Sequence, residues 1–500
     1  MTREKKALLT SFSSMLHQII SLVCGFILPR LFLARYGSTV NGLTSSITQF
    51  LGFITLAECG VGSVVQSSLY KPLAEKNVEE ISKIFKSSNR FFNKLGIILF
   101  VYTILLAVFY PFIVAESFDY IFTASLILII SISTFARYYL GMSYRMIVGA
   151  DQYGFVNHSL SCIALLLNTA ACVVLIKLDM PIHVVKLVSS LIFFAQPVIL
   201  LMFAKRKYTI DTSVVLTEEP IKQKWNGLAQ HIASVVNGNT DTVVLTLFST
   251  LENVSVYAVY HMVVNGIKSI VSALTNGYIA MFGNMLAKKE TQVLNATFSA
   301  FEWLIHTITT LSFALTCILI VPFVGVYTRG VEDVNYIVPT FGMLISIAQA
   351  SYCLRLPYSI MTMAACHYKQ TQVSSVIEAL LNIVVSVVFV FKFGLVGVAI
   401  GTLTAMLYRT CYLAIYLSKN IINRHIKHFI KHGVVDILSF CAMIYATSFL
   451  NSTVSNYREW VILALKCGVI CLALAAAVNL LLYRDDIRNC RKYILHHTRS

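Results

Sequence analysis

The chain has 500 residues, of which 57% are hydrophobic and only 12% are charged, and its mean hydropathy is +0.74. A soluble globular protein carries about 25% charged residues, so this composition excludes an ordinary water-soluble domain. Lys and Arg outnumber Asp and Glu by 39 to 23, which gives a net charge of +16. Such an excess indicates nucleic-acid binding in a soluble domain, but it usually marks cytoplasmic loops in a membrane protein. We therefore predict an all-α polytopic membrane protein with no nucleic-acid partner.

Apolar segments of about 20 residues, the length that crosses the hydrocarbon core, follow one another along the chain. Each must be helical, because a lipid-exposed backbone has to satisfy its hydrogen bonds within the segment. We predict about fourteen spans, at residues 8–33, 41–68, 91–111, 120–144, 154–176, 184–204, 226–248, 254–283, 297–322, 336–363, 371–391, 395–418, 434–449 and 460–482.

Basic residues are distributed unevenly over the connections between these spans. Alternate connections on one side hold 26 Lys and Arg, whereas those on the other side hold five. Because basic loops are retained in the cytoplasm, we predict that both termini are cytoplasmic.

The two halves of the chain show weak internal similarity at an offset of about 214 residues. With about six helices in each half, both copies enter the membrane in the same direction, which is the parallel-repeat plan of transporters with a site between the halves. The matched pairs are Tyr138 with Tyr352, Leu140 with Leu354, Tyr144 with Tyr358, and Asn168 with Asn382.

This repeat predicts a two-lobe organisation followed by a helix pair that has no counterpart. The predicted parts are an N-lobe (1–204), a cytoplasmic inter-lobe linker (205–224), a C-lobe (225–418), a cytoplasmic amphipathic loop (419–433), the helix pair (434–482) and a basic cytoplasmic tail (483–500).

Basic side chains inside the predicted spans are candidates for a functional site. Each costs about 2.5–3.5 kcal/mol near the centre of a membrane helix, so placement against lipid is unfavourable. Arg137, Lys268 and Arg355 lie deepest, and the repeat brings Arg137 within one helical turn of Arg355. We expect them to face a shared cavity; the alternative is that each pairs with a carboxylate and joins helices. The others are Arg30, Lys94, Lys186, Arg409 and Lys466, of which Lys94 and Lys186 lie near span ends.

Three carboxylates are predicted to lie deep in the spans: Glu58, Asp241 and Glu378, whereas Glu302 is close to a cytoplasmic end. Asp241 ends the polar sequence Asn237-Gly-Asn-Thr-Asp241 in mid-span. A carboxylate there could bind a proton or a sodium ion that drives transport. Equally, it could be a structural partner for an inward-facing cation.

The sequence contains no pattern of an enzyme. The GxxxxGK[ST] phosphate loop is absent, and no loop is long enough to form a catalytic domain. The cysteines form no CxxC pair, and His17, His261 and His306 lack metal-ligand spacing. We therefore predict neither catalysis nor a resident cofactor, and expect these histidines to pack between helices.

Several segments together resemble the Wzx-like polysaccharide flippases, of O-antigen or teichoic-acid type, in the multidrug/oligosaccharidyl-lipid/polysaccharide exporter superfamily. These segments are Gly25-Phe-Ile-Leu-Pro-Arg30-Leu-Phe-Leu-Ala-Arg-Tyr-Gly37, Asn41-Gly-Leu43, Leu56-Ala-Glu-Cys-Gly-Val-Gly62, Leu69-Tyr-Lys-Pro-Leu-Ala74, and Asp241 followed by Val256-Tyr257.

The resemblance implies transport of an undecaprenyl-diphosphate-linked oligosaccharide from the inner to the outer leaflet of a bacterial inner membrane, by alternating access. It implies a role in the synthesis of surface polysaccharide such as lipopolysaccharide, alongside a polymerase or glycosyltransferases. It makes Arg30 a candidate for the cationic lining and places Glu58 at an acidic position of the family. Lys268 and Arg355 are not aligned with the family, so their candidacy rests on the charge argument.

Two other transport functions remain open at this point. One is a lipid II flippase of the same superfamily, which also has two lobes and an extra helix pair. The other is a multidrug or cation antiporter, whose cationic substrates would favour an acidic cavity. A scaffold without transport activity would have no use for buried charges that cost this much.

Overall fold

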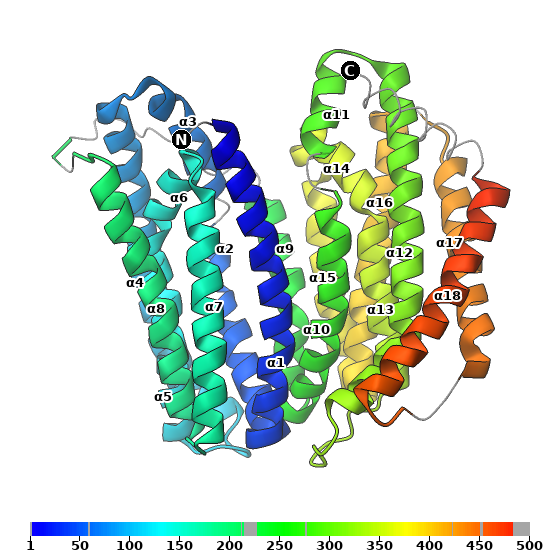
Figure 1. The fold of residues 1–500 in the computed structure, drawn as a ribbon, viewed down its shortest axis with the longest axis horizontal. Helices are drawn as coiled ribbons and strands as arrows, with labels where there is room; N and C mark the ends of the chain where they lie inside the picture. The colour runs from blue at the N-terminus through cyan, green and yellow to red at the C-terminus, as the bar shows by residue number, and fades with distance from the viewer. Residues whose placement is uncertain are drawn as a thin grey trace. The chain divides into compact units, whose positions relative to one another are not determined.

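The structure is a computed structural model that describes residues 3–58, 61–211, 213–214, 228–275, 278–422, 424–450 and 454–483. Within these ranges every regular element is a helix (Figure 1). The chain forms two compact units, Met1–Asn239 and Thr240–Ser500, which divide inside helix α9. Each unit is described separately below.

The first unit consists of long helices that run alongside one another, with α1 packed on α7 and α4 on α5. Its elements are α1 (Arg3–Gly52), α2 (Ile54–Glu58), α3 (Val61–Glu75), α4 (Val78–Ile113), α5 (Tyr120–Ala136), a π-helical turn (Arg137–Gly141), α6 (Met142–Ala150), α7 (Gly154–Lys177), α8 (Ile182–Lys207) and the first part of α9 (Leu228–Phe248).

Helix α1 is broken at Gly37, where the backbone has φ 79° and ψ 176°. Glycine adopts positive φ without a steric penalty, whereas other residues rarely do. An unbroken helix of 50 residues would extend about 75 Å, more than twice the thickness of the hydrocarbon core. The break at Gly37 therefore separates the first predicted span from the second.

The second unit is also a helical bundle, in which α15 packs most extensively on α16 and α12 contacts both C-terminal helices. Its elements are the rest of α9, α10 (Leu251–Ala273), α11 (Tyr278–Ala287), α12 (Thr291–Tyr327), α13 (Pro339–Leu354), α14 (Leu356–Ala364), α15 (Tyr368–Phe393), α16 (Leu395–Asn420), α17 (Lys427–Thr447), a 3₁₀ turn (Ser448–Leu450) and α18 (Tyr457–Leu482).

Helices α15 and α16 approach one another closely because small residues face each other at their contact. A Cβ atom added to Gly401 would lie 2.1 Å from Ser386 Oγ. Small residues commonly allow such close approach between membrane helices. The contact brings polar side chains of both helices, including Asn382 and Thr402, next to α9.

The membrane character of the chain is confirmed. Eleven helices in the described ranges are long and apolar enough to cross a bilayer. Large apolar side chains also point outward, among them Ile121 at 79% exposure and Leu481 at 80%. Such positions are unfavourable in water but favourable against lipid.

The other predicted spans coincide with interrupted or partly described helices. Span 41–68 is divided among the end of α1, α2 and α3; span 336–363 is divided between α13 and α14; span 226–248 corresponds to α9. The total number of spans and the orientation of the termini stay predictions. Residues 215–224 of the predicted linker and 484–500 of the predicted tail lie outside the described residues.

A cluster around Asp151 joins three elements at one end of the first unit. Lys6 Nζ lies 3.4 Å and Lys207 Nζ 3.5 Å from carboxylate oxygens of Asp151, and the Tyr208 hydroxyl donates to that carboxylate at 2.9 Å. Burial and the adjacent Asp151 charge raise the pKa of Tyr208. The cluster thereby fixes the start of α1 and the end of α8 to the turn between α6 and α7.

Candidate functional site

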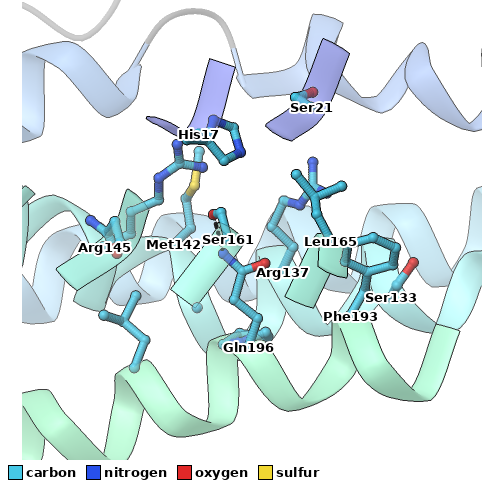
Figure 2. A pocket seen from close by; sticks show the side chains of 14 residues that line it. His17, Ser21, Ser133, Arg137, Met142, Arg145, Ser161, Leu165, Phe193 and Gln196 are labelled. Atoms are coloured by element: carbon cyan, nitrogen blue, oxygen red, sulfur yellow. Dashed lines mark hydrogen bonds between the residues drawn. The ribbon is translucent and has the colours of Figure 1, made fainter. Parts of the chain in front are cut away.

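A pocket of about 300 Å³ lies within the first unit (Figure 2). It is lined by residues of α1, α5, α6, α7, α8 and the π-helical turn: His17, Ser21, Ser133, Arg137, Gly141, Met142, Arg145, Asn157, Ser161, Leu165, Phe193, Gln196, Pro197 and Leu200. The lining has two guanidinium groups and contains neither Asp nor Glu. Its charge therefore suits an anionic ligand.

The π-helical turn brings Arg137 and Arg145 to the same face. In an uninterrupted α-helix, a residue eight positions later would be rotated by about 80° around the axis. A π turn inserts one extra residue into the helix. The interval from Arg137 to Arg145 then makes about two complete turns, so both arginines are exposed in the pocket while Tyr138 is buried on the opposite side.

The remaining polar side chains of the pocket come from the helices around it. The Gln196 amide donates to the Ser161 hydroxyl at 2.7 Å, which joins α8 to α7, as Figure 2 shows. His17 of α1 lines the pocket, and its ring centroid lies 6.0 Å from that of His158. We expected His17 to be a packing residue, whereas the structure places it beside the arginines.

Arg145 is a pocket residue that the sequence analysis missed. The fourth predicted span ends at residue 144, so Arg145 falls in the connection that follows this span. In the structure it belongs to α6, which continues the helix after the π turn. The signal in the sequence was the spacing of Arg137 and Arg145 on either side of Gly141. That spacing places both on one face only when a π turn lies between them.

Glu58 lies behind the pocket instead of inside it. It ends α2, and its carboxylate accepts a hydrogen bond from the buried Tyr138 hydroxyl at 3.3 Å. Since Tyr138 follows Arg137 directly, Glu58 contacts the back of the π turn. Arg30 is half-buried in α1 and is not one of the residues that line the pocket. Their parts in a shared site with Arg137 stay predictions.

In the second unit, Lys268 and Arg355 converge on one tyrosine ring. Lys268 Nζ lies 3.9 Å from the ring centroid of Tyr352, and Arg355 Cζ lies 4.5 Å from it. Arg355 forms an ion pair with Glu378, and Arg409 Nε lies 3.7 Å from the other oxygen of that carboxylate. Two arginines thus contact a single acid, and Lys268 shares the Tyr352 ring with one of them.

Arg409 is held firmly within this cluster. The residue is 7% exposed, and its side chain donates to the Thr371 carbonyl at 3.0 Å and bonds to the Ser374 hydroxyl. Glu378, at 4% exposure, is the partner of two arginines. The alternative in which a deep cation pairs with a carboxylate therefore describes Arg355. Lys268 forms no ion pair within the described part of the chain.

Arg137 and Arg355 both stand at an interruption of a membrane helix. Arg137 opens the π turn between α5 and α6, and Arg355 occupies the break between α13 and α14. Tyr138 and Tyr352, matched by the repeat, contact the adjoining charges in their respective units. Superposition of the two halves stays a prediction.

Asp241 is surrounded by polar groups from three other helices. Its carboxylate accepts hydrogen bonds from the Tyr257 hydroxyl at 3.0 Å, the Thr402 hydroxyl at 2.8 Å and the Asn382 amide at 3.3 Å. Asp241 is 4% exposed. The Thr402 hydroxyl has a single hydrogen, for which the Asn382 side-chain oxygen at 3.4 Å and the Val398 carbonyl at 3.2 Å are alternative acceptors. Hard cations favour such oxygen ligands.

No family model matches the chain, and no curated protein matches it in sequence. Solved structures do match. The lipid II flippase MurJ in an inward closed conformation superposes with a TM-score of 0.72 at 17% identity, covering 96% of this chain and 100% of that one.

Two MATE transporters, the first described as a multidrug resistance transporter, are similar over somewhat less of the chain. An inward-facing MATE family transporter has a TM-score of 0.59 at 14% identity and covers 83% of this chain and 98% of its own. A eukaryotic MATE transporter has a TM-score of 0.53 at 14% identity, with 86% and 98% coverage. The chain is therefore a multi-pass membrane protein with the fold shared by the MurJ flippase and the MATE transporters.

Proposed function

We propose that this protein is a secondary transporter that flips an undecaprenyl-diphosphate-linked oligosaccharide from the inner to the outer leaflet by alternating access. The observation that carries the proposal is the pocket that contains Arg137 and Arg145 and no acidic side chain. The fold agrees with it, because similar structures include a flippase and transporters. The sequence resemblance supplies the substrate class and a role in surface polysaccharide synthesis in a bacterial inner membrane.

A diphosphate fits the chemistry of the pocket. Guanidinium groups bind phosphate oxygens through two parallel charge-assisted hydrogen bonds, which are stronger than those to a neutral ligand, and they repel a cationic one. Arg137 and Arg145 on the same helical face present two such groups. The polar Ser161, Gln196 and Asn157 can hydrogen-bond to sugar hydroxyls.

The other candidate residues have different roles in this proposal. Lys268 carries the charge in the second unit that remains available to a substrate, since Glu378 engages Arg355 and Arg409. The role of Arg30 as part of a cationic lining follows from the family resemblance. Glu58 supports the π turn through Tyr138.

We further propose that Asp241 binds the coupling cation, a proton or a sodium ion. Its oxygen-rich surroundings fit a hard cation, and its deep burial makes a bare carboxylate charge costly. A cation gradient would then supply the free energy of transport. No other cofactor is part of the proposal.

A lipid II flippase is the second candidate function, and the similarity to MurJ favours it. A multidrug or cation antiporter is less favoured, because a lipophilic cation would be repelled by Arg137 and Arg145. A polysaccharide polymerase or glycosyltransferases would be partners of the polysaccharide function alone.

Ligand binding to the full-length protein in lipid nanodiscs tests the proposal. The probes are a polyprenyl-diphosphate-linked oligosaccharide, lipid II and a lipophilic cation. Arg137→Ala and Arg145→Ala should each weaken binding of the first probe by about ten- to a hundred-fold, which corresponds to one lost charge-assisted contact. Arg90→Ala, at an exposed position of α4, is the matched control and should bind normally.

The three probes separate the candidate functions. Preferential binding of lipid II would replace the polysaccharide substrate by the second candidate. Preferential binding of the cation, or unchanged diphosphate binding in both arginine variants, would overturn the proposed function.

A further inference from the structure

A buried polar network joins α12 to the C-terminal helix pair of the second unit, α17 and α18. It is separate from the Arg137 pocket and from the Tyr352 cluster. Its members from α12 are Glu302 at 0% exposure and His306 at 2%. The groups that face them are Tyr358 of α14, Arg424 before α17, His432 and Asp436 of α17, and Tyr483 after α18.

His306 lies in the middle of a continuous chain of hydrogen bonds. Its Nδ1 is 2.6 Å from Asp436 Oδ2, and its Nε2 is 3.0 Å from the Tyr358 hydroxyl oxygen. The Tyr358 hydroxyl in turn donates to Glu302 Oε1 at 2.8 Å. The second oxygen of Asp436 accepts from the Thr310 hydroxyl at 2.9 Å. Two carboxylates are therefore connected through one imidazole.

The number of available hydrogen atoms determines the protonation state of His306. A tyrosine hydroxyl has one hydrogen, and that of Tyr358 is used toward Glu302. His306 Nε2 must then donate to the Tyr358 oxygen. Since a carboxylate only accepts, Nδ1 must donate to Asp436 as well. Both ring nitrogens carry protons, so the arrangement requires the imidazolium form.

The charges of the network agree with this assignment. Arg424 Nη2 donates to Glu302 Oε2 at 2.5 Å, and this pair is neutral in sum. A protonated His306 likewise neutralises Asp436. A neutral His306 would leave the network with one uncompensated negative charge, which is unfavourable in a buried environment.

A second histidine, His432, lies close to the same acid. Its Nε2 is 3.6 Å from Glu302 Oε2, its Nδ1 is 2.8 Å from the Tyr483 hydroxyl, and its ring centroid is 5.0 Å from that of His306. If His306 and His432 were both protonated, the network would have a net charge of +1. Only one of the two histidines therefore carries the extra proton. The hydrogen bonds assign it to His306.

We propose that His306 is a proton-binding site whose occupancy controls the attachment of α17 and α18 to α12. With the proton bound, His306 joins α12 to Asp436 of α17. When the proton leaves, one ring nitrogen loses its hydrogen, and either the bond to Asp436 or the bond to Tyr358 is lost. In both cases the contact with Asp436 also loses its charge assistance, so the attachment weakens as the pH rises. The network is not a metal site, because no three metal-ligating side chains converge within the described ranges.

Cys471 reports on this attachment. It is 0% exposed in α18 and packs with Ala314 of α12 and Met443 of α17. Separation of the helix pair from α12 would expose its thiol to N-ethylmaleimide. Cys172 of α7, at 1% exposure in the first unit, is the internal reference for the general increase in thiol reactivity with pH. Mass spectrometry of the labelled full-length protein gives the ratio of the two labelling rates.

The ratio of Cys471 to Cys172 labelling should rise by about tenfold between pH 6 and pH 9, the change in opening equilibrium expected from one lost charge-assisted hydrogen bond. His306→Gln should give a high ratio that no longer depends on pH. Asp436→Asn should also remove the pH dependence, because it removes the negative charge that the protonated His306 neutralises. Thr310→Val, which removes a bond but no titrating group, should keep the pH dependence.

The proposal goes beyond the transport function, since the measurement requires no substrate. A ratio that is constant with pH in the unmodified protein would overturn it. So would a normal pH dependence in both His306→Gln and Asp436→Asn. Loss of the pH dependence in His432→Gln, with its retention in His306→Gln, would transfer the proton to His432 and overturn the assignment to His306.

Discussion

Arg137 and Arg355 occupy similar places in their units, yet their surroundings differ. Both stand where a membrane helix is interrupted, and each adjoins a tyrosine. Arg137 lies with Arg145 in a pocket without acids, whereas Arg355 pairs with Glu378, which also binds Arg409. Cations that are equally deep in the sequence can thus have different surroundings: one lines a pocket, and the other joins helices through a carboxylate.

Removing the acid from the second unit should have the largest effect. Glu378→Ala would leave Arg355 and Arg409 without their carboxylate in a buried site. Breaking one side of a buried ion pair costs about 3–5 kcal/mol, because the remaining charge is uncompensated. We expect a large fall in melting temperature in detergent and in protein abundance. A stable variant would show that the cluster is hydrated and that Arg355 resembles Arg137 after all.

The pocket of the first unit should be sensitive to the contact between the π-helical turn and α8. A Cβ atom added to Gly141 would lie 2.7 Å from Pro197 Cβ, and both residues line the pocket. Gly141→Ala should therefore destabilise the protein by about 1–3 kcal/mol, as overpacking does, and should weaken ligand binding.

Gly25→Ala is the matched control for this change. Nothing lies within 4 Å of a Cβ atom added to Gly25 in α1. Alanine is favoured over glycine in a helix by about 0.5–1 kcal/mol, so stability should be unchanged or slightly higher. Equal melting temperatures for Gly141→Ala and Gly25→Ala would show that α8 can move away without consequence.

Replacement of arginine by lysine should have a different effect in each of the two units. Lysine keeps the charge but loses the bidentate geometry. We expect Arg137→Lys to reduce affinity for a diphosphate ligand by about tenfold with an unchanged melting temperature. Arg355→Lys should lower the melting temperature while affinity is retained. The reverse pattern, measured by ligand titration and thermal unfolding, would exchange the roles of the two arginines.

The membrane fold could be predicted because it depends on composition and on apolar segment length, both of which are local properties. The break at Gly37 falls between the first two predicted spans, in a stretch that contains Arg35, Ser38 and Asn41. The interruption at Arg355 was less visible, since apolar residues continue on both sides of it. The alternatives for Arg355 could not be resolved, because its partner Glu378 is 23 residues away on another helix. The pair of His306 and Asp436 is separated by 130 residues, and sequence spacing carries no information about such contacts.

A change beside Asp241, Thr402→Val, should have the smallest effect. It tests whether the Asp241 charge is structural or functional. The Thr402 hydroxyl donates to the Asp241 carboxylate at 2.8 Å, and Thr402 is 1% exposed. Thr402→Val keeps the shape of the side chain and removes one oxygen. If Asp241 binds sodium, that loss should weaken binding, and the stabilisation that sodium provides by mass action should shrink. In sodium-free buffer the cost should be about 0.5–1.5 kcal/mol, that of one hydrogen bond.

Thr404→Val, two residues along α16 at an exposed position, is the control, because the Thr404 hydroxyl donates only to the Ile400 carbonyl. Melting curves of the unmodified protein, Thr402→Val and Thr404→Val over a series of sodium concentrations test whether Asp241 binds the ion. A sodium-dependent rise that is reduced only in Thr402→Val assigns the ion to Asp241. Identical sodium responses in all three, or none in the unmodified protein, would leave Asp241 as a proton site or a structural partner of its neighbouring helices.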